Sequence, residues 1–131
     1  MTSGEVIAAI RQVFPGARVM TLDAHYDPPD SARLDRIIHW RPWWKLWIRP
    51  SYETDSFDCD DYALRSFEIK WNYKKGNLPF GFVIGSKFRG VSGFHAVNMV
   101  VCTDGPWLYD AQPDEWWKAD PEGDVISFVL I

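Results

Sequence analysis

The first half of the chain carries apolar stripes at helical spacing, separated by proline-rich breaks. In residues 3–14 the apolar side chains recur every three or four positions, which predicts an amphipathic helix opened by Thr2 or Ser3. A short helix is predicted for residues 31–40, after a Pro-Pro break. The next helical pattern runs over residues 59–74 and ends close to a glycine, as helices commonly do.

The helix predicted for residues 59–74 starts in an acidic cluster. Asp58 is a good N-cap, and Asp60 and Asp61 lie in the first turn, where the helix dipole favours negative charge. Four residues at a spacing of four share one face of this helix: Cys59, Ala63, Phe67 and Trp71. The start of this helix is therefore the first candidate for a chemical site.

The second half of the chain has the short apolar runs and the turns of β-strands. Asp104-Gly105 is a hairpin signal between two of these runs. The predicted strands are residues 80–84, 93–102, 107–110 and 125–131, with a further short strand at residues 17–22. Helices followed by strands predict an α+β fold, in which the N-terminal helices and the helix of residues 59–74 pack on an antiparallel sheet.

Composition and charge exclude several classes of protein. With 47% hydrophobic and 24% charged residues, the chain has the balance of a globular protein, and its 131 residues predict a single domain over residues 1–131. A net charge of −4 argues against a general nucleic-acid binder. No apolar run is long enough to span a membrane, and the N-terminus lacks the pattern of a secretory signal, which predicts a cytoplasmic location.

Residues 40–50 form an unusual segment, WRPWWKLWIRP, which interleaves tryptophan with basic residues. Its central part, residues 43–49, fits either a helix or a loop. Aromatic and basic side chains together can bind sugars, bases or a membrane surface, and they also form packed cores and cleft walls. If the segment lines a cleft opposite the last strand motif, the expected substrate-binding residues are Trp43, Trp44, Trp47 and Trp116.

Cys59, His95 and Asp110 together have the residue types of a cysteine-enzyme triad. A thiol attacks as its thiolate, so it needs a base, and a third group that orients the base. His95 begins a predicted strand and Asp110 ends the next one, but Asp110 falls short of lying directly opposite His95. A bulge or a longer loop is therefore expected between these strands. Gln112 and Asn98 are alternatives for the orienting role.

Three short segments together resemble motifs of the papain-like and transglutaminase-like cysteine peptidase superfamily. They are FDCDDYA at residues 57–63, FHAVN at residues 94–98 and YDAQP at residues 109–113. The nearest resemblance is to the papain-like C-terminal domain of Marasmius oreades agglutinin and its stand-alone relatives, which are often found in phage genomes. It implies a papain-like fold with a transglutaminase-like core, in which Cys59 is the nucleophile, His95 its base and Asp110 the orienting acid. Asp110 stands where the family usually has a glutamate.

The resemblance also implies calcium, because the family's enzyme is a calcium-dependent protease. Its calcium ligands would fall on Asp60, Asp61 and Gln112. The acids have a physical argument of their own, because carboxylates beside a thiol raise its pKa and a bound hard cation would offset them. The alternative is that Asp58 and Asp61 only cap the helix while Asp55 faces water. Zinc does not fit, since no two Cys or His residues have ligand spacing.

Two functions of different classes follow from these features. The first is a small cysteine hydrolase, a calcium-dependent peptidase that acts on a protein or peptide substrate through a thioester acyl-enzyme; a transglutaminase would share that intermediate. The second is a non-catalytic binding module of the same fold, whose Trp-rich surface holds a protein, glycan or nucleic acid. The enzyme needs an accessible, acidic Cys59, whereas the binding module tolerates a buried one, as expected for Cys102. A phage-encoded enzyme would act in the host cytoplasm.

Overall fold

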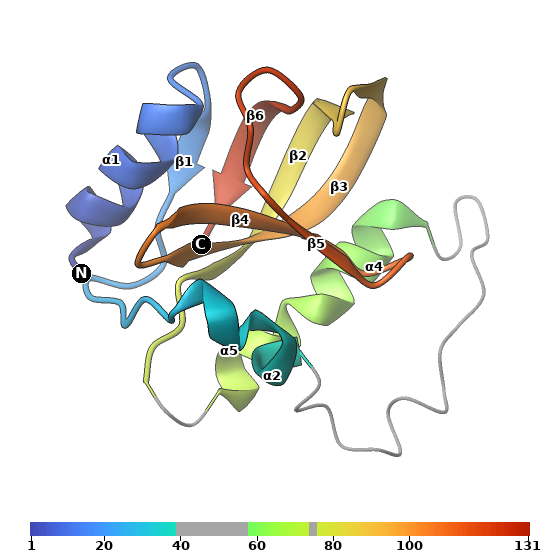
Figure 1. Ribbon diagram of the computed structural model, residues 1–131. Helices are drawn as coiled ribbons and strands as arrows, with labels where there is room; N and C mark the ends of the chain where they lie inside the picture. Colours follow the sequence, from blue (N-terminus) through green and yellow to red (C-terminus); the bar gives the residue numbers. More distant parts are fainter. Residues whose placement is uncertain (39–57, 74–75) are drawn as a thin grey trace, which may run out of the picture.

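A mixed sheet of six strands forms the centre of the fold in Figure 1, a computed structural model that describes residues 1–38, 58–73 and 76–131. From edge to edge the strands follow the order β1-β6-β2-β3-β4-β5. They are β1 (Arg18–Met20), β2 (Phe80–Phe88), β3 (Val91–Cys102), β4 (Gly105–Asp110), β5 (Glu115–Lys118) and β6 (Val125–Leu130). With helices on both faces, the chain is an α+β domain, as the order of its elements predicts.

The predicted antiparallel sheet is wrong at one edge, where β1 runs parallel to β6 through pairs such as Arg18↔Phe128. These strands lie at opposite ends of the chain, so no hairpin fixes their relative direction. The other neighbouring pairs are antiparallel. Strand β5 was not predicted, because its sequence EWWK is short and does not alternate; it pairs with β4 through Leu108↔Trp117.

The helices are α1 (Ser3–Val13), the 3-10 helix η1 (Ser31–Arg33), α2 (Leu34–Ile38), α4 (Cys59–Ser66) and α5 (Glu68–Asn72). A capping box starts α1, in which Glu5 N–H donates to Thr2 Oγ1 (3.3 Å) and Thr2 N–H donates to Glu5 Oε2 (2.6 Å). The helix predicted for residues 59–74 is divided at Phe67. Trp71 is therefore 66% exposed, although its ring still meets Phe67 edge-on at 4.8 Å.

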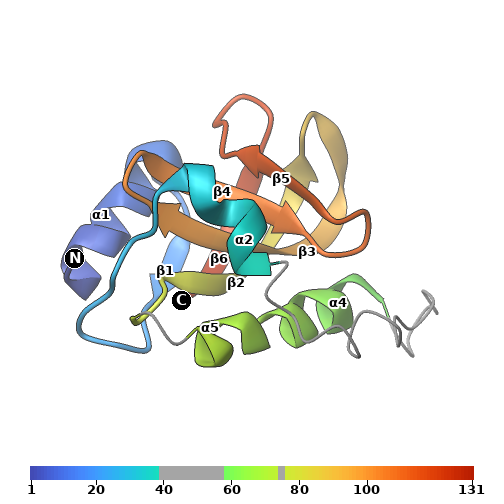
Figure 2. The ribbon, with the colours of Figure 1, turned by 60° about the horizontal axis from the view of Figure 1, so that its bottom comes forward.

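The helices cover opposite faces of the sheet, as Figures 1 and 2 show. Odd-numbered residues of β3, such as Val97 and Met99, pack with α1, and even-numbered ones, such as Ala96 and Val100, pack with the other helices. This alternation is the period of a strand buried on both faces. Within the described residues, no helix is long and apolar enough to cross a membrane.

Candidate functional site

The imidazole of His95 and the carboxylate of Asp110 form the best-defined polar pair of the site. His95 Nε2 lies 2.8 Å from Asp110 Oδ2, and the two side chains are 27% and 16% exposed. The other oxygen, Asp110 Oδ1, accepts the N–H of Gln112 at 3.1 Å. An ionised carboxylate only accepts hydrogen bonds, so the contact assigns the proton to Nε2 and leaves Nδ1 as the basic nitrogen.

The two strands bring His95 and Asp110 together without the bulge that the sequence led us to expect. The pairing of β3 with β4 runs from Cys102↔Gly105 to Asn98↔Tyr109 with no shift of register. One more step along this ladder places Asp110 opposite Val97. His95 lies two residues before Val97, so His95 and Asp110 are diagonal neighbours, a separation that long side chains can span. A bulge does lie next to the site, but in the pairing of β3 with β2, just before His95.

Cys59 is the first residue of α4, and it lies half-buried against Ala96, the residue that follows His95. The N–H of Ala96 donates to the Cys59 thiol group. Along β3, the N–H groups of alternate residues face opposite neighbouring strands. Those of the odd-numbered residues face β2, as in the bond from Val101 N–H to Pro79 O, so the N–H of Ala96 faces the β4 side. Because β4 ends at Asp110, no residue of β4 pairs with Ala96. The N–H of Ala96 can therefore donate to the sulfur of Cys59.

The surroundings of Cys59 raise the pKa of its thiol. Burial is the largest cause that raises the pKa of Cys59, and the negative charges of Asp58 and Asp60 raise it further. The N–H groups of Ala96 and Asp60 act in the opposite direction, because they stabilise a thiolate. An attacking thiolate at this position therefore needs a base, or a cation that offsets the two carboxylates.

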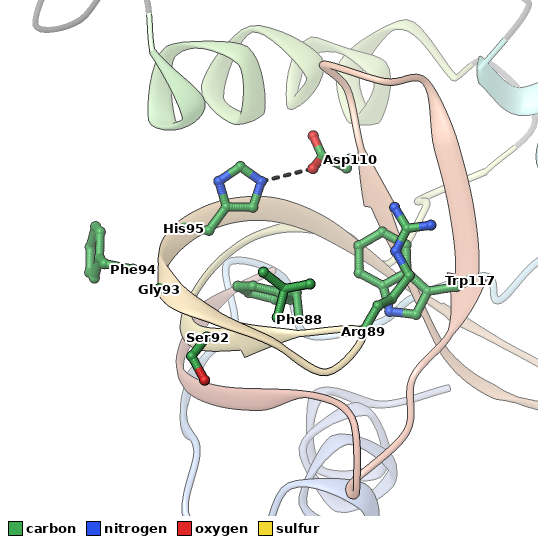
Figure 3. A pocket seen from close by; sticks show the side chains of 9 residues that line it. Phe88, Arg89, Ser92, Gly93, Phe94, His95, Asp110 and Trp117 are labelled. Carbon is green, nitrogen blue, oxygen red and sulfur yellow. Dashed lines mark hydrogen bonds and ion pairs between the residues drawn. The ribbon is translucent and has the colours of Figure 1, made fainter.

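His95 precedes Ala96 on β3, so its backbone adjoins the residue that contacts Cys59. Figure 3 shows its imidazole between β3 and the pale green helix α4, with Asp110 beyond it. Its ring also meets Phe88 edge-on, at 5.8 Å between centroids. Among the described residues no hydrogen bond joins Cys59 to His95, and such contacts are often long in an enzyme without substrate.

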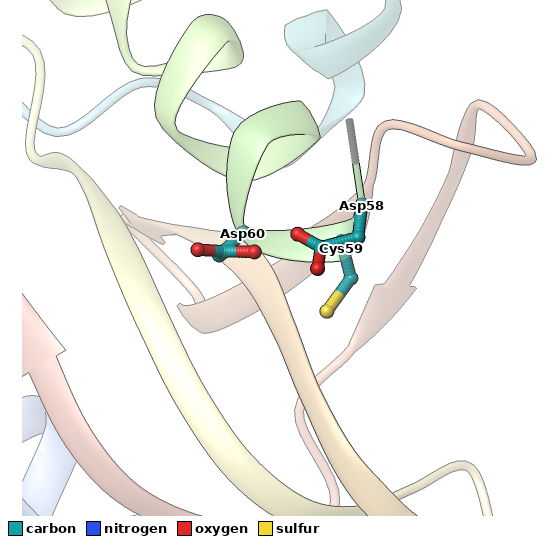
Figure 4. Close-up of side chains that lie close together, drawn as sticks. All are labelled: Asp58, Cys59 and Asp60. Atoms are coloured by element: carbon teal, nitrogen blue, oxygen red, sulfur yellow. The ribbon is translucent and has the colours of Figure 1, made fainter. Parts of the chain in front are cut away.

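The acidic start of α4 gathers Asp58 and Asp60 around the sulfur of Cys59. Their ligand atoms all lie within 4.8 Å of one another (Figure 4). Asp61 has a different position, since its Oδ2 accepts the N–H of Asp58 at 3.2 Å and so caps the helix. Gln112 lies on the exposed turn after β4. Calcium binding by Asp60, Asp61 and Gln112 stays a prediction.

Asn98, the alternative orienting residue, has a different role. Its side chain is completely buried, and Nδ2 donates to Ala63 O of α4 (2.8 Å) and to Gly81 O of β2 (3.1 Å). Its Oδ1 is buried without a hydrogen-bond partner among the described residues. Asn98 therefore ties α4 to the sheet rather than orienting His95.

The expected substrate-binding tryptophans are only partly within the described residues. Trp43, Trp44 and Trp47 lie outside them, and the half-buried Trp116 stacks on Tyr109 with 4.7 Å between ring centroids. Its neighbour Trp117 instead lines a pocket of about 390 Å³, here called the His95 pocket (Figure 3). The residues of this pocket that the later argument uses are Phe88, Arg89, Val91, Phe94, His95, Asp110 and Trp117. The sequence signal for it was Phe94, which precedes His95 in the FHAVN motif.

Comparisons with known proteins reveal a likeness of fold. No protein-family model matches the sequence, and no curated protein matches it significantly. Among solved structures, the chain is similar to one described as "PSL1a-E64 complex", with a TM-score of 0.74 and 22% identity. The match covers 100% of this chain and 51% of that chain, so this chain spans about half the length of its neighbour. At this identity the likeness shows the fold alone.

Proposed function

We propose that this chain is a papain-like cysteine hydrolase that cleaves peptide or amide bonds, with Cys59 as the nucleophile. The observation that carries the proposal is the His95–Asp110 hydrogen bond of 2.8 Å, in which His95 is the residue before Ala96, whose N–H donates to Cys59 at the start of α4. An oriented imidazole next to a thiol at a helix N-terminus is the arrangement that nucleophilic catalysis requires. The described complex of the structural neighbour with E64 makes that compound a probe for this chain.

The proposed reaction begins when His95 Nδ1 takes the thiol proton of Cys59. The sulfur then attacks the carbonyl carbon, and the carbonyl oxygen becomes an oxyanion that the N–H of Cys59 can stabilise at the helix start. The imidazolium gives its proton to the amine as the C–N bond breaks, which leaves a thioester on Cys59. Water, deprotonated by His95, hydrolyses the thioester and restores the thiol. Asp110 stabilises the imidazolium throughout.

Calcium belongs to this proposal as an activator. The carboxylates of Asp58 and Asp60 fit a hard cation, whereas the nearby sulfur of Cys59 is a poor ligand for one. A cation held by these two carboxylates would offset the charges that raise the pKa of Cys59. Of the other expected ligands, Asp61 would have to join from the helix cap and Gln112 from the turn after β4.

The test combines thiol reactivity with peptide cleavage. Iodoacetamide labelling is followed against pH by peptide mass, with Cys102 as the internal control, and a mixture of peptides is incubated with the wild type and with Cys59→Ala. We expect Cys59 to react faster than Cys102, and new peptide products and an E64-induced rise in Tm in the wild type alone. Identical products from Cys59→Ala would refute the proposal. An inert Cys59 would favour the non-catalytic binding module instead.

A further inference from the structure

The His95 pocket has a shape and a position that the triad alone does not explain. It measures about 390 Å³, within the range of small-ligand sites, and most of its walls are apolar or aromatic. Of the residues that line it, Phe94 is 76% exposed and Val91 is 73% exposed. Large exposed apolar side chains that border a concave surface indicate a binding site.

The expected triad residues that line the pocket indicate which part of a substrate it would bind. His95 and Asp110 form part of its wall, whereas Cys59 does not. In the proposed reaction Cys59 keeps the acyl part of the substrate, and His95 hands its proton to the departing amine. A pocket on the His95 side therefore lies beside the residue that leaves.

We infer that the His95 pocket binds a large apolar side chain, aromatic or branched aliphatic, on the residue that follows the scissile bond of a polypeptide substrate. This inference rests on the proposed hydrolase function and names its substrate class. Arg89 is the cationic side chain among the described residues that line the pocket. It already forms an ion pair with Glu115 at 2.7 Å and lies over the Trp117 ring at 4.3 Å. An acidic side chain would have to break that pair, whereas an apolar one would not.

The pocket walls are held in place by one buried carboxylate. Asp124 is 2% exposed, and it accepts the N–H of Arg89 at 2.9 Å and the indole Nε1–H of Trp117 at 3.2 Å. It thereby fastens the β2–β3 hairpin to β5, both of which contribute lining residues to the pocket. A preformed pocket spares the substrate the cost of ordering it.

The edge of β3 beside the pocket offers main-chain partners for an extended substrate. The pairing of β4 with β3 stops at Asn98↔Tyr109, although β3 begins at Val91. In the described part of the chain, no strand pairs with the intervening edge of β3 on this side. The N–H of Ala96 on this edge already donates to Cys59, which leaves the edge before Ala96 for an extended peptide that passes His95 with one side chain in the pocket.

A binding experiment tests the pocket without relying on turnover. Phe-Gly-amide, which represents the released amine product, is titrated into Cys59→Ala and followed by ¹⁵N NMR, with Gly-Gly-amide as the comparison. We expect the amide of Phe94 and the indole N–H of Trp117 to shift, with an affinity for Phe-Gly-amide at least about tenfold higher, as burial of a phenyl ring provides. Equal binding of both peptides, or shifts confined to other regions, would overturn the inference.

Matched variants and product sequences complete the test. Phe94→Ala, made in the Cys59→Ala background, should lose most of the preference for Phe-Gly-amide, and Trp71→Ala, which removes another exposed aromatic ring, should keep it. In the active protein, peptide products should begin with Phe, Tyr, Trp, Leu, Ile or Met. Cleavage that depends on Cys59 but lacks this preference refutes the pocket assignment alone. The absence of any cleavage refutes the proposed function and this inference with it.

Discussion

His95 and Asp110 are hydrogen-bonded at 2.8 Å although they are not partners in the β3–β4 ladder. The ladder places them on a diagonal, and that spacing suits a long imidazole and a short carboxylate. The contact shows that an aspartate at this position reaches His95, although the family that the sequence resembles usually has a glutamate there. Because Asp110 Oδ1 also accepts the Gln112 N–H, the carboxylate is held from two sides and fixes the imidazole.

Replacement of this carboxylate should affect catalysis far more than folding. We expect Asp110→Asn to lower kcat by about two to four orders of magnitude, because the amide no longer stabilises the imidazolium and can hold the wrong tautomer. Asp110→Glu is the matched control, since it keeps the charge and should retain more activity. The measurements are kcat and KM on one cleaved peptide, with Tm as the check on folding. A kcat for Asp110→Asn equal to that of the wild type would exclude Asp110 from the triad.

In the absence of a cation, Asp58 and Asp60 should reduce the fraction of Cys59 that is ionised. Their charges raise the pKa of Cys59, so Asp58→Asn and Asp60→Asn should lower it and increase the thiolate population at neutral pH. We expect iodoacetamide to label Cys59 about three to ten times faster in these variants, in low salt and without calcium. Asp35→Asn, an exposed acid on α2, serves as the control variant.

Calcium should reproduce the effect of these substitutions if it binds to the same carboxylates. Added Ca²⁺ should then accelerate labelling of Cys59 in the wild type and have little effect on the double variant Asp58→Asn/Asp60→Asn. Mg²⁺ at the same concentration controls for general screening of charge. An equal response of the wild type and the double variant would show that calcium, if it acts, binds elsewhere.

Cys102, like Cys59, has a raised thiol pKa, and its shift is large enough to affect stability at high pH. Burial is the largest cause that raises its pKa to about 12, with help from the charges of Asp104 and Asp30. A thiol exposed to water has a pKa of 9.0, so an unfolded chain loses this proton near pH 9 while the folded chain keeps it until about pH 12. Stability should therefore fall as pH rises through this window. Urea unfolding should show a shallower fall for Cys102→Ala than for the wild type, and parallel pH profiles would contradict the assignment.

The sequence predicted the helices and strands whose apolar residues recur with a regular spacing. The apolar spacing of residues 3–14 gave α1, and the alternating runs gave the cores of β2, β3, β4 and β6. The parallel β1–β6 pair could not be predicted, because it joins the two ends of the chain and no local signal records direction. The break at Phe67 was missed because the apolar spacing continues across it.

The candidate site was likewise predictable from the sequence only in part. Residue types and hairpin arithmetic were sufficient to bring His95 near Asp110, because both lie close to one turn. The contact of Cys59 with the Ala96 N–H depends on where β4 ends, which no side-chain pattern specifies. The His95 pocket combines residues of β2, β3 and β5, so only the folded chain assembles it.

Asn98 should prove essential for the position of α4. Its Nδ2 is the donor for two buried carbonyls, those of Ala63 and Gly81, so Asn98→Asp would place a carboxylate against two oxygens and remove the donor. We expect Asn98→Ala to lower the free energy of unfolding by about 1–3 kcal/mol, and Asn98→Asp to lower it further. Asn77→Ala is the control, because the Asn77 amide donates at 2.7 Å to His25 O on the exposed surface, where water can replace it. Urea unfolding measures stability, and iodoacetamide labelling of Cys59 at a urea concentration where all variants remain folded reports its surroundings. A stable Asn98→Asp with unchanged labelling would mean that the packing of α4, rather than this amide, sets the place of the nucleophile.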